Sequence, residues 1–213
     1  MAKQIFSKLE AVKFGWETMK KHFWFFLQII IIVFLISYGP SLVANALDKI
    51  ELPTIAVLFF FLFGIVFWGL QLLISIGVIK IALRFVSGST SKLKELFSGA
   101  GLIINYVVSS VLYGLVVFFG FILLVVPGII FAVRFQFYQY LVVDKNMGPI
   151  EALKVSWHIT DGSFWNLVLY WLLVAGINIL GILALGIGLL ATIPTTVVAT
   201  AWVYKKLSQK SHA

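Results

Sequence analysis

Residues 102–133 read LIINYVVSSVLYGLVVFFGFILLVVPGIIFAV, a run of 32 residues without a charged side chain. A helix of about 20 apolar residues crosses a hydrocarbon core about 30 Å thick, so this run is long enough for more than one span. Pro127-Gly128 interrupts the run, because proline lacks the backbone donor that a continuing helix needs. The stretch therefore predicts two membrane helices, at residues 102–126 and 128–143.

Further apolar runs lie on both sides of this stretch. They cover residues 23–43, 54–79 and 164–204, and Gly186, Gly188 and Pro194 divide the last run in two. Gly39-Pro40 is expected to bend or end the first run. The sequence thus predicts an all-α integral membrane protein with six transmembrane helices, in a single membrane domain over residues 1–213.

Composition supports this class and removes several kinds of chemistry. Hydrophobic residues make up 62% of the chain and charged residues 11%, against about 25% charged in soluble domains. The chain has no cysteine, so thiolate nucleophiles and thiolate metal sites are excluded, and His22, His158 and His212 form no metal-ligand spacing. Ser, His and Asp occur together only within residues 156–163, which more simply form a helix and its end. We expect a non-enzymatic protein without a cofactor.

The segment before the first apolar run has the pattern of an amphipathic helix. In MAKQIFSKLEAVKFGWETMKK, apolar residues recur every three or four positions at Ile5, Leu9, Val12, Trp16 and Met19. Lysines and glutamates occupy the other faces, which favours a helix in the headgroup region with Trp16 as an interfacial anchor. A solvated helix packed on a partner is the alternative.

The basic residues indicate an orientation. With six spans and both termini in the cytoplasm, 14 of the 16 Lys and Arg residues lie on the inner side, only Lys49 lies outside and Arg134 lies in the membrane. This satisfies the positive-inside preference and predicts a multi-pass protein of the inner (plasma) membrane. Because the net charge of +8 is dispersed over several juxtamembrane segments, anionic membrane lipids are the expected partners and nucleic acid is not. The sequence identifies no protein partner.

The chain also resembles itself. Residues 10–16 match residues 151–157, and Phe23-Trp24 matches Phe164-Trp165, at the same offset of 141 positions. A second similarity relates residues 79–85 to residues 129–135. We interpret these matches as a threefold repeat of an amphipathic helix plus a helical hairpin, and coincidence among apolar segments is the alternative. The units cover residues 1–88, 89–145 and 146–208, and Trp157 becomes a second interfacial anchor equivalent to Trp16.

The second half of the chain carries a family resemblance. The motifs are Val126-Pro127-Gly128-Ile129-Ile130, Arg134-Phe135, Asp144-Lys145, the segment 151–157 and Gly162-Ser163-Phe164-Trp165. Their succession resembles a broad bacterial and archaeal group of six-helix membrane proteins that includes the membrane domain of some glycerophosphodiester phosphodiesterases. The resemblance implies a compact six-helix membrane domain. It implies no catalysis, because the phosphodiesterase activity belongs to a separate soluble domain.

Arg134 is the one charged residue deep within an apolar region, which makes it the first candidate for a functional site. We predict an anion or lipid-headgroup site around it, with polar partners at Gln136, Gln139, Gln71 and Asn105. No buried carboxylate is available nearby in sequence to pair with it, since all eight acidic residues lie at span ends or in loops. The alternative is an arginine that snorkels or bonds to carbonyls freed by the helix break.

These observations favour a protein that binds or organises lipid, or a membrane scaffold for a partner. A small transporter or permease for a lipidic or anionic solute is the second hypothesis. Proton-coupled transport is disfavoured, because proton paths use intramembrane Asp, Glu or His and the spans contain none.

Overall fold

The computed structural model describes residues 6–47 and 53–210, and within these ranges every regular element is a helix, as predicted. Ile5 and Lys49, on which two sequence predictions depend, lie outside the described residues. The elements in chain order are α1 (Lys8–Lys21), α2 (Phe23–Leu47), α3 (Thr54–Val86), η1 (Leu93–Phe97), η2 (Ala100–Leu102), α4 (Ile103–Leu123), α5 (Val125–Phe135), α6 (Tyr138–Lys145), α7 (Pro149–Ile159), α8 (Phe164–Leu183) and α9 (Leu189–Lys210).

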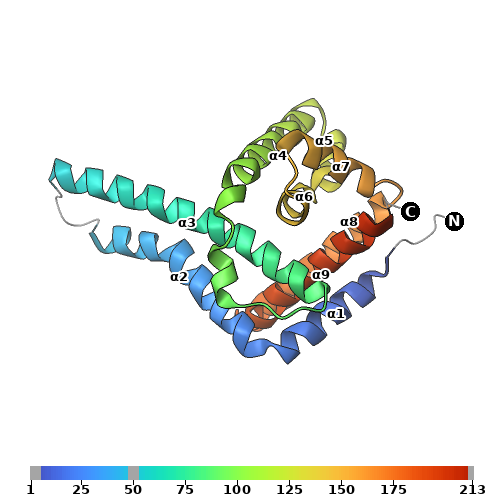
Figure 1. Ribbon diagram of the computed structural model, residues 1–213, viewed down its shortest axis with the longest axis horizontal. Coiled ribbons are helices and arrows are strands. Elements are labelled where there is room, and N and C mark those ends of the chain that lie inside the picture. The colour runs from blue at the N-terminus through green and yellow to red at the C-terminus, as the bar shows by residue number, and fades with distance from the viewer. Residues whose placement is uncertain (1–5, 48–52, 211–213) are drawn as a thin grey trace.

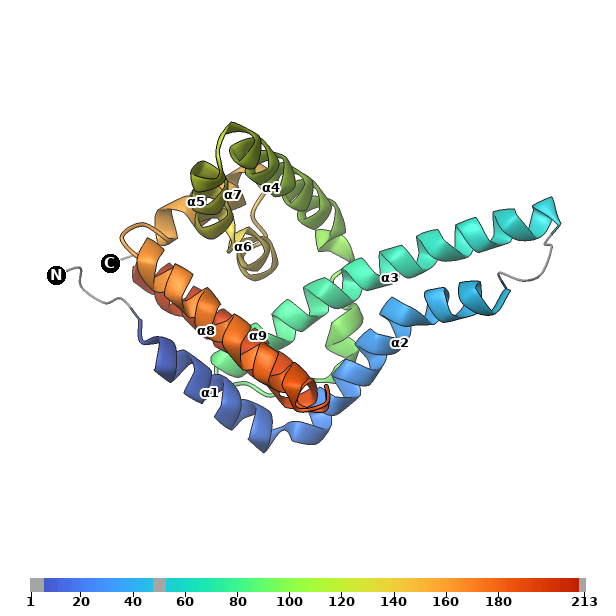
Figure 2. The ribbon, with the colours of Figure 1, turned by 180° about the vertical axis from the view of Figure 1, so that it is seen from behind.

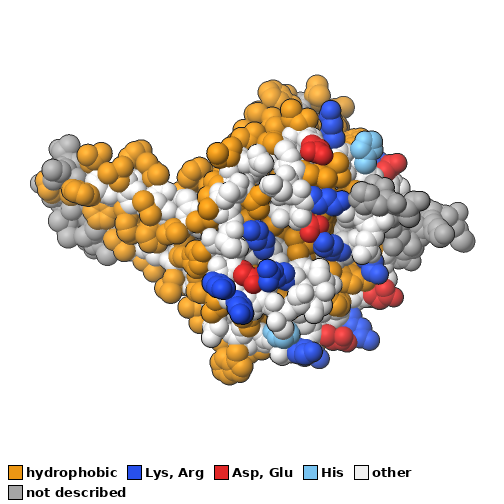
Figure 3. Space-filling view, in the orientation of Figure 1, with side chains coloured by type: hydrophobic (Ala, Val, Ile, Leu, Met, Phe, Trp, Pro, Cys, Tyr) orange, Lys and Arg blue, Asp and Glu red, His pale blue; other side chains and the backbone are white. Residues whose placement is uncertain are grey.

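The helices form a compact body from which one hairpin projects (Figure 1). The far parts of α2 and α3 extend away from the other helices, whereas α1 lies along α9 and α4 to α7 gather on the other side of α3 (Figures 1 and 2). The main core lies within this body and includes Leu141 and Val142 of α6 and Tyr204 and Leu207 of α9, all fully buried. Hydrophobic side chains cover the projecting hairpin, and charges of both signs share one face of the body (Figure 3).

By length and composition, five segments can cross a membrane. They are Phe23–Asn45, Ala56–Val86, Leu93–Leu123, Val125–Lys145 and Phe164–Leu183. The predicted sixth span corresponds to α9, which is less apolar because it carries four threonines between positions 192 and 200 and three lysines near its end. Val198, Ala199 and Ala201 of α9 are fully buried, so other helices rather than lipid cover much of its surface.

The long uncharged run breaks at a different residue from the one predicted. The backbone is extended at Leu124, with φ −167° and ψ 155°, so α4 ends at Leu123 and α5 begins at Val125. Pro127 therefore lies in the first turn of α5. Backbone N–H groups in the first turn have no acceptor within the helix, so proline costs no helical hydrogen bond there. The predicted span over residues 102–126 was too long by three residues for this reason.

Two other helix boundaries correct the sequence prediction. The predicted span at residues 128–143 is not one helix, because α5 ends at Phe135 and α6 begins at Tyr138. Conversely, α2 continues through Pro40 to Leu47, so Gly39-Pro40, which was expected to bend or end this helix, does not end it. The composition of each segment predicted its apolar character but not which of its prolines would interrupt a helix.

The amphipathic segment forms a helix, α1, as predicted. The residues buried on this helix are Ala11, Gly15 and Met19. On the apolar face that was predicted to lie in the headgroup region, Met19 is buried, whereas Leu9 and Trp16 are 74% and 43% exposed. Small side chains bring α1 close to α9, and a Cβ at Gly15 would overlap the carbonyl oxygen of Thr195. The large apolar residues are left free to face lipid.

The two segments matched at an offset of 141 have similar local structures. In each, a short helix is followed within four residues by a long apolar helix, which begins at Phe23 in α2 and at Phe164 in α8. Both starting residues agree with the sequence prediction. The corresponding part of the middle unit forms only the short helix η1.

Candidate functional site

Arg134 lies at the end of α5, and its side chain is only 18% exposed. Its Nη1 atom is 2.8 Å from Oδ1 of Asp161, and its guanidinium carbon is 4.9 Å from the ring centroid of Trp157. Its Nε is buried and has no hydrogen-bond partner among the described residues. The sequence, in which no buried carboxylate lies near Arg134, did not reveal this partner, because Asp161 is exposed and lies 27 positions along the chain.

A group of buried hydroxyls holds the break between α5 and α6. The Ser156 hydroxyl donates to the Arg134 carbonyl at 2.9 Å and accepts from the Phe137 N–H at 3.1 Å. The Thr160 hydroxyl also reaches the Arg134 carbonyl, at 3.2 Å. Since Ser156 and Thr160 are both fully buried on or next to α7, that helix supplies the hydrogen bonds that the interrupted helix cannot make itself.

The other predicted site residues are not all brought to Arg134. Gln136 lies at the same break, where its side chain donates to the Val133 carbonyl at 2.7 Å and accepts from the Trp171 indole N–H. Gln139 donates to the Tyr138 hydroxyl at 2.9 Å.

Gln71 and Asn105 have partners of their own. The Gln71 side-chain amide donates to the Ser37 hydroxyl of α2 at 3.5 Å, and the backbone carbonyl of Asn105 accepts from the Ser109 hydroxyl within α4. Both therefore make contacts within or between long helices. An anion site at Arg134 stays a hypothesis, whereas the contacts of its guanidinium with Asp161 and Trp157 favour the alternative of a structural arginine.

The two predicted interfacial anchors differ in environment. Trp16 is partly exposed, with the Lys20 ammonium 5.6 Å from its ring centroid. Trp157 is half-buried and contacts Arg134 together with the rings of Phe131 and Phe135. Trp16 is the more open of the two.

A second charged cluster was not predicted. It surrounds a cavity of about 280 Å³ and joins three elements, through Lys80 and Arg84 of α3, Glu95 of η1 and Asp144 of α6. Arg84 Nη1 lies 2.8 Å from Glu95 Oε1. Because the Arg84 side chain is 55% exposed, solvent screens this pair and it adds little stability.

Asp144 connects the cluster to the end of α9. Its carboxylate accepts from the Lys205 ammonium at 2.8 Å and from the Tyr204 hydroxyl at 2.9 Å. Lys80 donates to the Ser98 carbonyl at 2.9 Å. Each of these charges lies at the end of an apolar run, and this position could have marked them as candidates in the sequence. The sequence does not indicate that the ends of these different runs lie next to one another in the fold.

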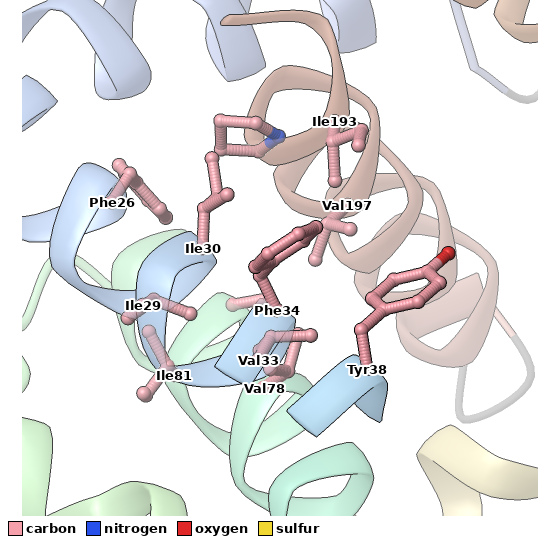
Figure 4. A pocket seen from close by; sticks show the side chains of 12 residues that line it. Phe26, Ile29, Ile30, Val33, Phe34, Tyr38, Val78, Ile81, Ile193 and Val197 are labelled. Atoms are coloured by element: carbon pink, nitrogen blue, oxygen red, sulfur yellow. The ribbon is translucent and has the colours of Figure 1, made fainter. Parts of the chain in front are cut away.

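The third feature is an apolar cleft of about 250 Å³ between α2, α3 and α9. The lining residues are Phe26, Ile29, Ile30, Val33, Phe34, Tyr38, Val78, Ile81, Ala82, Ile193, Pro194 and Val197. Figure 4 shows Phe34 of α2 on the side of the cleft opposite Ile193 and Val197 of α9. The Tyr38 hydroxyl is the only side-chain polar group among these residues, so the cleft suits a hydrocarbon ligand.

Replacing Arg134 tests whether the residue is structural. We expect Arg134→Leu to lower the free energy of unfolding in detergent by only about 1 kcal/mol, because the Asp161 carboxylate is 74% exposed and the contact with Trp157 is a single cation–π pair. The rise in melting temperature on adding anionic phospholipid should be unchanged. If Arg134→Leu abolishes that rise while Arg134→Lys keeps part of it, Arg134 binds the anion.

Five apolar helices in an all-helical fold indicate a membrane-embedded protein. The chain belongs to the family described as a domain of unknown function, DUF7847, which matches residues 50–209. This match says nothing about glycerophosphodiester phosphodiesterases, so that resemblance stays a prediction.

Two relatives come from mycobacteria. The chain is 29% identical over 172 residues to the uncharacterized protein Rv2560 of Mycobacterium tuberculosis (strain ATCC 25618 / H37Rv), a match that covers 80% of this chain and 52% of the relative. It is 28% identical, with the same coverage, to the uncharacterized protein Mb2590 of Mycobacterium bovis (strain ATCC BAA-935 / AF2122/97). The chain thus spans about half the length of the curated relatives it matches. No solved structure matches it significantly.

Proposed function

We propose that this chain is a non-enzymatic integral membrane protein that binds membrane lipid, with an acyl chain in the cleft between α2, α3 and α9. The observation that carries the proposal is the cleft itself, with a volume of about 250 Å³ and walls of aliphatic and aromatic side chains. Its rim includes Phe34 and Tyr38, which are 53% and 57% exposed on α2. A chain from the surrounding bilayer can therefore enter from the side.

Packing rather than hydrophobicity favours this occupant. Lipid tails are as apolar as the side chains, so moving a tail from the bilayer into the cleft removes no apolar surface from water. An empty cleft, however, leaves its lining atoms without dispersion partners on one side. A flexible acyl chain restores those contacts without introducing a polar group that the cleft cannot satisfy.

Basic side chains near tryptophans favour anionic headgroups for these lipids. The Lys20 ammonium lies 5.6 Å from the Trp16 ring centroid, and the Lys206 ammonium lies 5.2 Å from that of Trp202. Tryptophan prefers the level of the headgroups, and lysines there attract anionic lipid. The net charge of +8 acts in the same direction.

The proposal includes six membrane-inserted segments in three hairpins, α2–α3, α4–α5 and α8–α9, with both termini on the cytoplasmic side of the inner membrane. α9 is the sixth segment. Its burial among other helices lets it carry threonines at membrane depth, since their hydroxyls donate to carbonyls of the same helix, as Thr195 does to Ala191.

The threefold repeat is part of this proposal and is supported by how its units interlock. The first segment of each unit packs on the second hairpin segment of another unit. Gly15 of α1 meets α9, Gly77 of α3 meets Leu96 of η1, and Ser156 of α7 bonds to the α5–α6 break. The three contacts therefore follow one cyclic order along the units.

Filling the cleft tests the proposed function. In Val33→Trp the indole occupies the space of an acyl chain. The purified variant should therefore retain less phospholipid, measured by mass spectrometry, and should lose most of the lipid-dependent rise in melting temperature. The matched control is Val111→Trp, on the exposed face of α4, where valine is 56% exposed. Equal lipid retention and equal stabilisation in the two variants would refute a lipid in the cleft.

A transporter is the second hypothesis, and the positions of the apolar cleft and the charged cavity disfavour it. Arg134 lines neither the apolar cleft nor the charged cavity, and these two cavities lie on different faces of α3. They therefore do not join into a polar path through Arg134, as transport of an anionic solute past that residue would need.

A further inference from the structure

Two helical hairpins end in turns made of exposed apolar residues. In the α4–α5 turn, Leu123, Leu124, Val125 and Val126 are 62% to 73% exposed. In the α8–α9 turn, Leu185 and Ile187 are 90% and 70% exposed. The nearest charges along the chain are distant, because residues 96–133 and 162–204 contain none. Water is an unfavourable environment for both turns.

We propose that the α4–α5 and α8–α9 hairpins are re-entrant, with turns that end within the hydrocarbon core and contact acyl chains, while the α2–α3 hairpin crosses the bilayer. This inference rests on the membrane embedding in the proposed function and not on the lipid in the cleft. It assigns acyl chains as the partner of both turns.

The length of α5 limits how deep its turn can reach. Asp161 is 74% exposed and pairs with Arg134, so this ion pair lies at the level of water or headgroups. Nine residues separate Val125 from Arg134, which is about 14 Å along a helix at 1.5 Å per residue. The hydrocarbon core is about 30 Å thick, so the turn ends near its middle.

The polarity of α4 agrees with this depth. Its first half carries Asn105, Tyr106, Ser109, Ser110 and Tyr113, whereas residues 114–123 have no polar side chain. The apolar half of α4 is therefore about as long as α5, which has 11 residues. Only the apolar half of α4 and the turn that follows it can therefore face acyl chains on every exposed side.

The α8–α9 turn is similarly limited. Sixteen residues separate Leu189 from Lys205, or about 24 Å, which is shorter than the hydrocarbon core. Ile193, close to the start of α9, faces the middle of α2 across the cleft (Figure 4). Tyr38, the last α2 residue lining that cleft, is nine positions before the end of α2 at Leu47. The α8–α9 turn therefore stops short of the α2–α3 turn.

Part of the backbone of each turn is satisfied within the chain. The Leu124 N–H donates to the Gly120 carbonyl at 3.1 Å, and the Gly186 N–H donates to the Ile182 carbonyl at 3.0 Å. Leu185 and Gly186 have φ of 57° and 76°, which closes the second turn tightly. Backbone groups that are satisfied internally are what a segment in hydrocarbon requires.

Interfacial anchors are missing from both turns. Trp165 and Trp171 lie in the first half of α8, and Trp202 lies in the second half of α9, while α4 and α5 contain no tryptophan. A hairpin that emerged on the far side would be expected to carry tryptophan, tyrosine or charged residues at that interface. The protein thus displaces acyl chains mainly in the leaflet next to its charged face.

Single cysteines test the inference, since the chain has none of its own. The substitutions are Leu124→Cys and Leu185→Cys, with Asp48→Cys as the reference for the far side and Gly148→Cys for the near side. In sealed cells and in inverted vesicles, an impermeant maleimide should label positions 124 and 185 at least about tenfold more slowly than the accessible reference, because hydrocarbon suppresses the reactive thiolate. Both should react after detergent solubilisation.

The outcomes separate this inference from the proposed function. Labelling of position 124 or 185 from outside at the rate of position 48 would mean that the hairpin crosses, which overturns the inference alone. Rapid labelling of all four positions in both preparations would remove the membrane embedding itself. Nitroxides at positions 124 and 185 provide a second measurement, and higher accessibility to a water-soluble nickel complex than to oxygen would also overturn the inference. Each variant must keep the wild-type melting temperature, which the exposure of both leucines favours.

Discussion

Gly15→Leu is expected to separate α1 from α9 and to cause the largest loss of stability among single substitutions in this helix. A Cβ at Gly15 would overlap the carbonyl oxygen of Thr195, which is a backbone atom that cannot rotate away. The cost should be at or above the upper end of the about 1–3 kcal/mol typical of overpacking. It should be measured as a fall in melting temperature in detergent, with faster proteolysis of α1.

Gly64→Leu is the matched control for this substitution. Gly64 lies inside α3, and a Cβ there would meet nothing within 4 Å. Because leucine favours helix over glycine by up to about 1 kcal/mol, this variant should be unchanged or slightly more stable. Equal melting temperatures for Gly15→Leu and Gly64→Leu would contradict the close packing of α1 on α9.

Local sequence determined the helices but not the contacts between them. Apolar runs are sufficient to predict where membrane helices lie, and the starts at Phe23 and Phe164 follow from composition alone. The exact break at Leu124 depends on an extended backbone conformation that no residue type there demands. The face of α1 that packs on α9 was not predicted, because close approach to α9 selects small residues such as Gly15 over large apolar ones.

The site was predictable only in part, for a similar reason. Arg134 could be recognised because a charge within an apolar run is rare and costly. Its partner Asp161 could not, because the pairing depends on how α7 folds back over the α5–α6 break. The cleft was also not predictable from the sequence, since α9 contributes to its walls from more than a hundred residues beyond α2 and α3.

Ser156→Ala is expected to loosen the α5–α6 break from α7. The Ser156 hydroxyl accepts from the Phe137 N–H and is one of two hydroxyls that donate to the Arg134 carbonyl, and it is fully buried. Alanine leaves that N–H without an acceptor, and an unsatisfied buried donor costs about 1–3 kcal/mol. The melting temperature in detergent should fall accordingly, and amide exchange at Phe137 should accelerate.

Ser109→Ala separates this loss from the removal of any buried serine hydroxyl. Ser109 is also fully buried, but its hydroxyl donates to the Asn105 carbonyl one turn back in α4, where the helix already supplies a backbone donor. Its replacement should therefore cost much less than that of Ser156. A fall of equal size in both variants, without faster exchange at Phe137, would mean that Ser156 only fills space and that the break between α5 and α6 is held by helix packing.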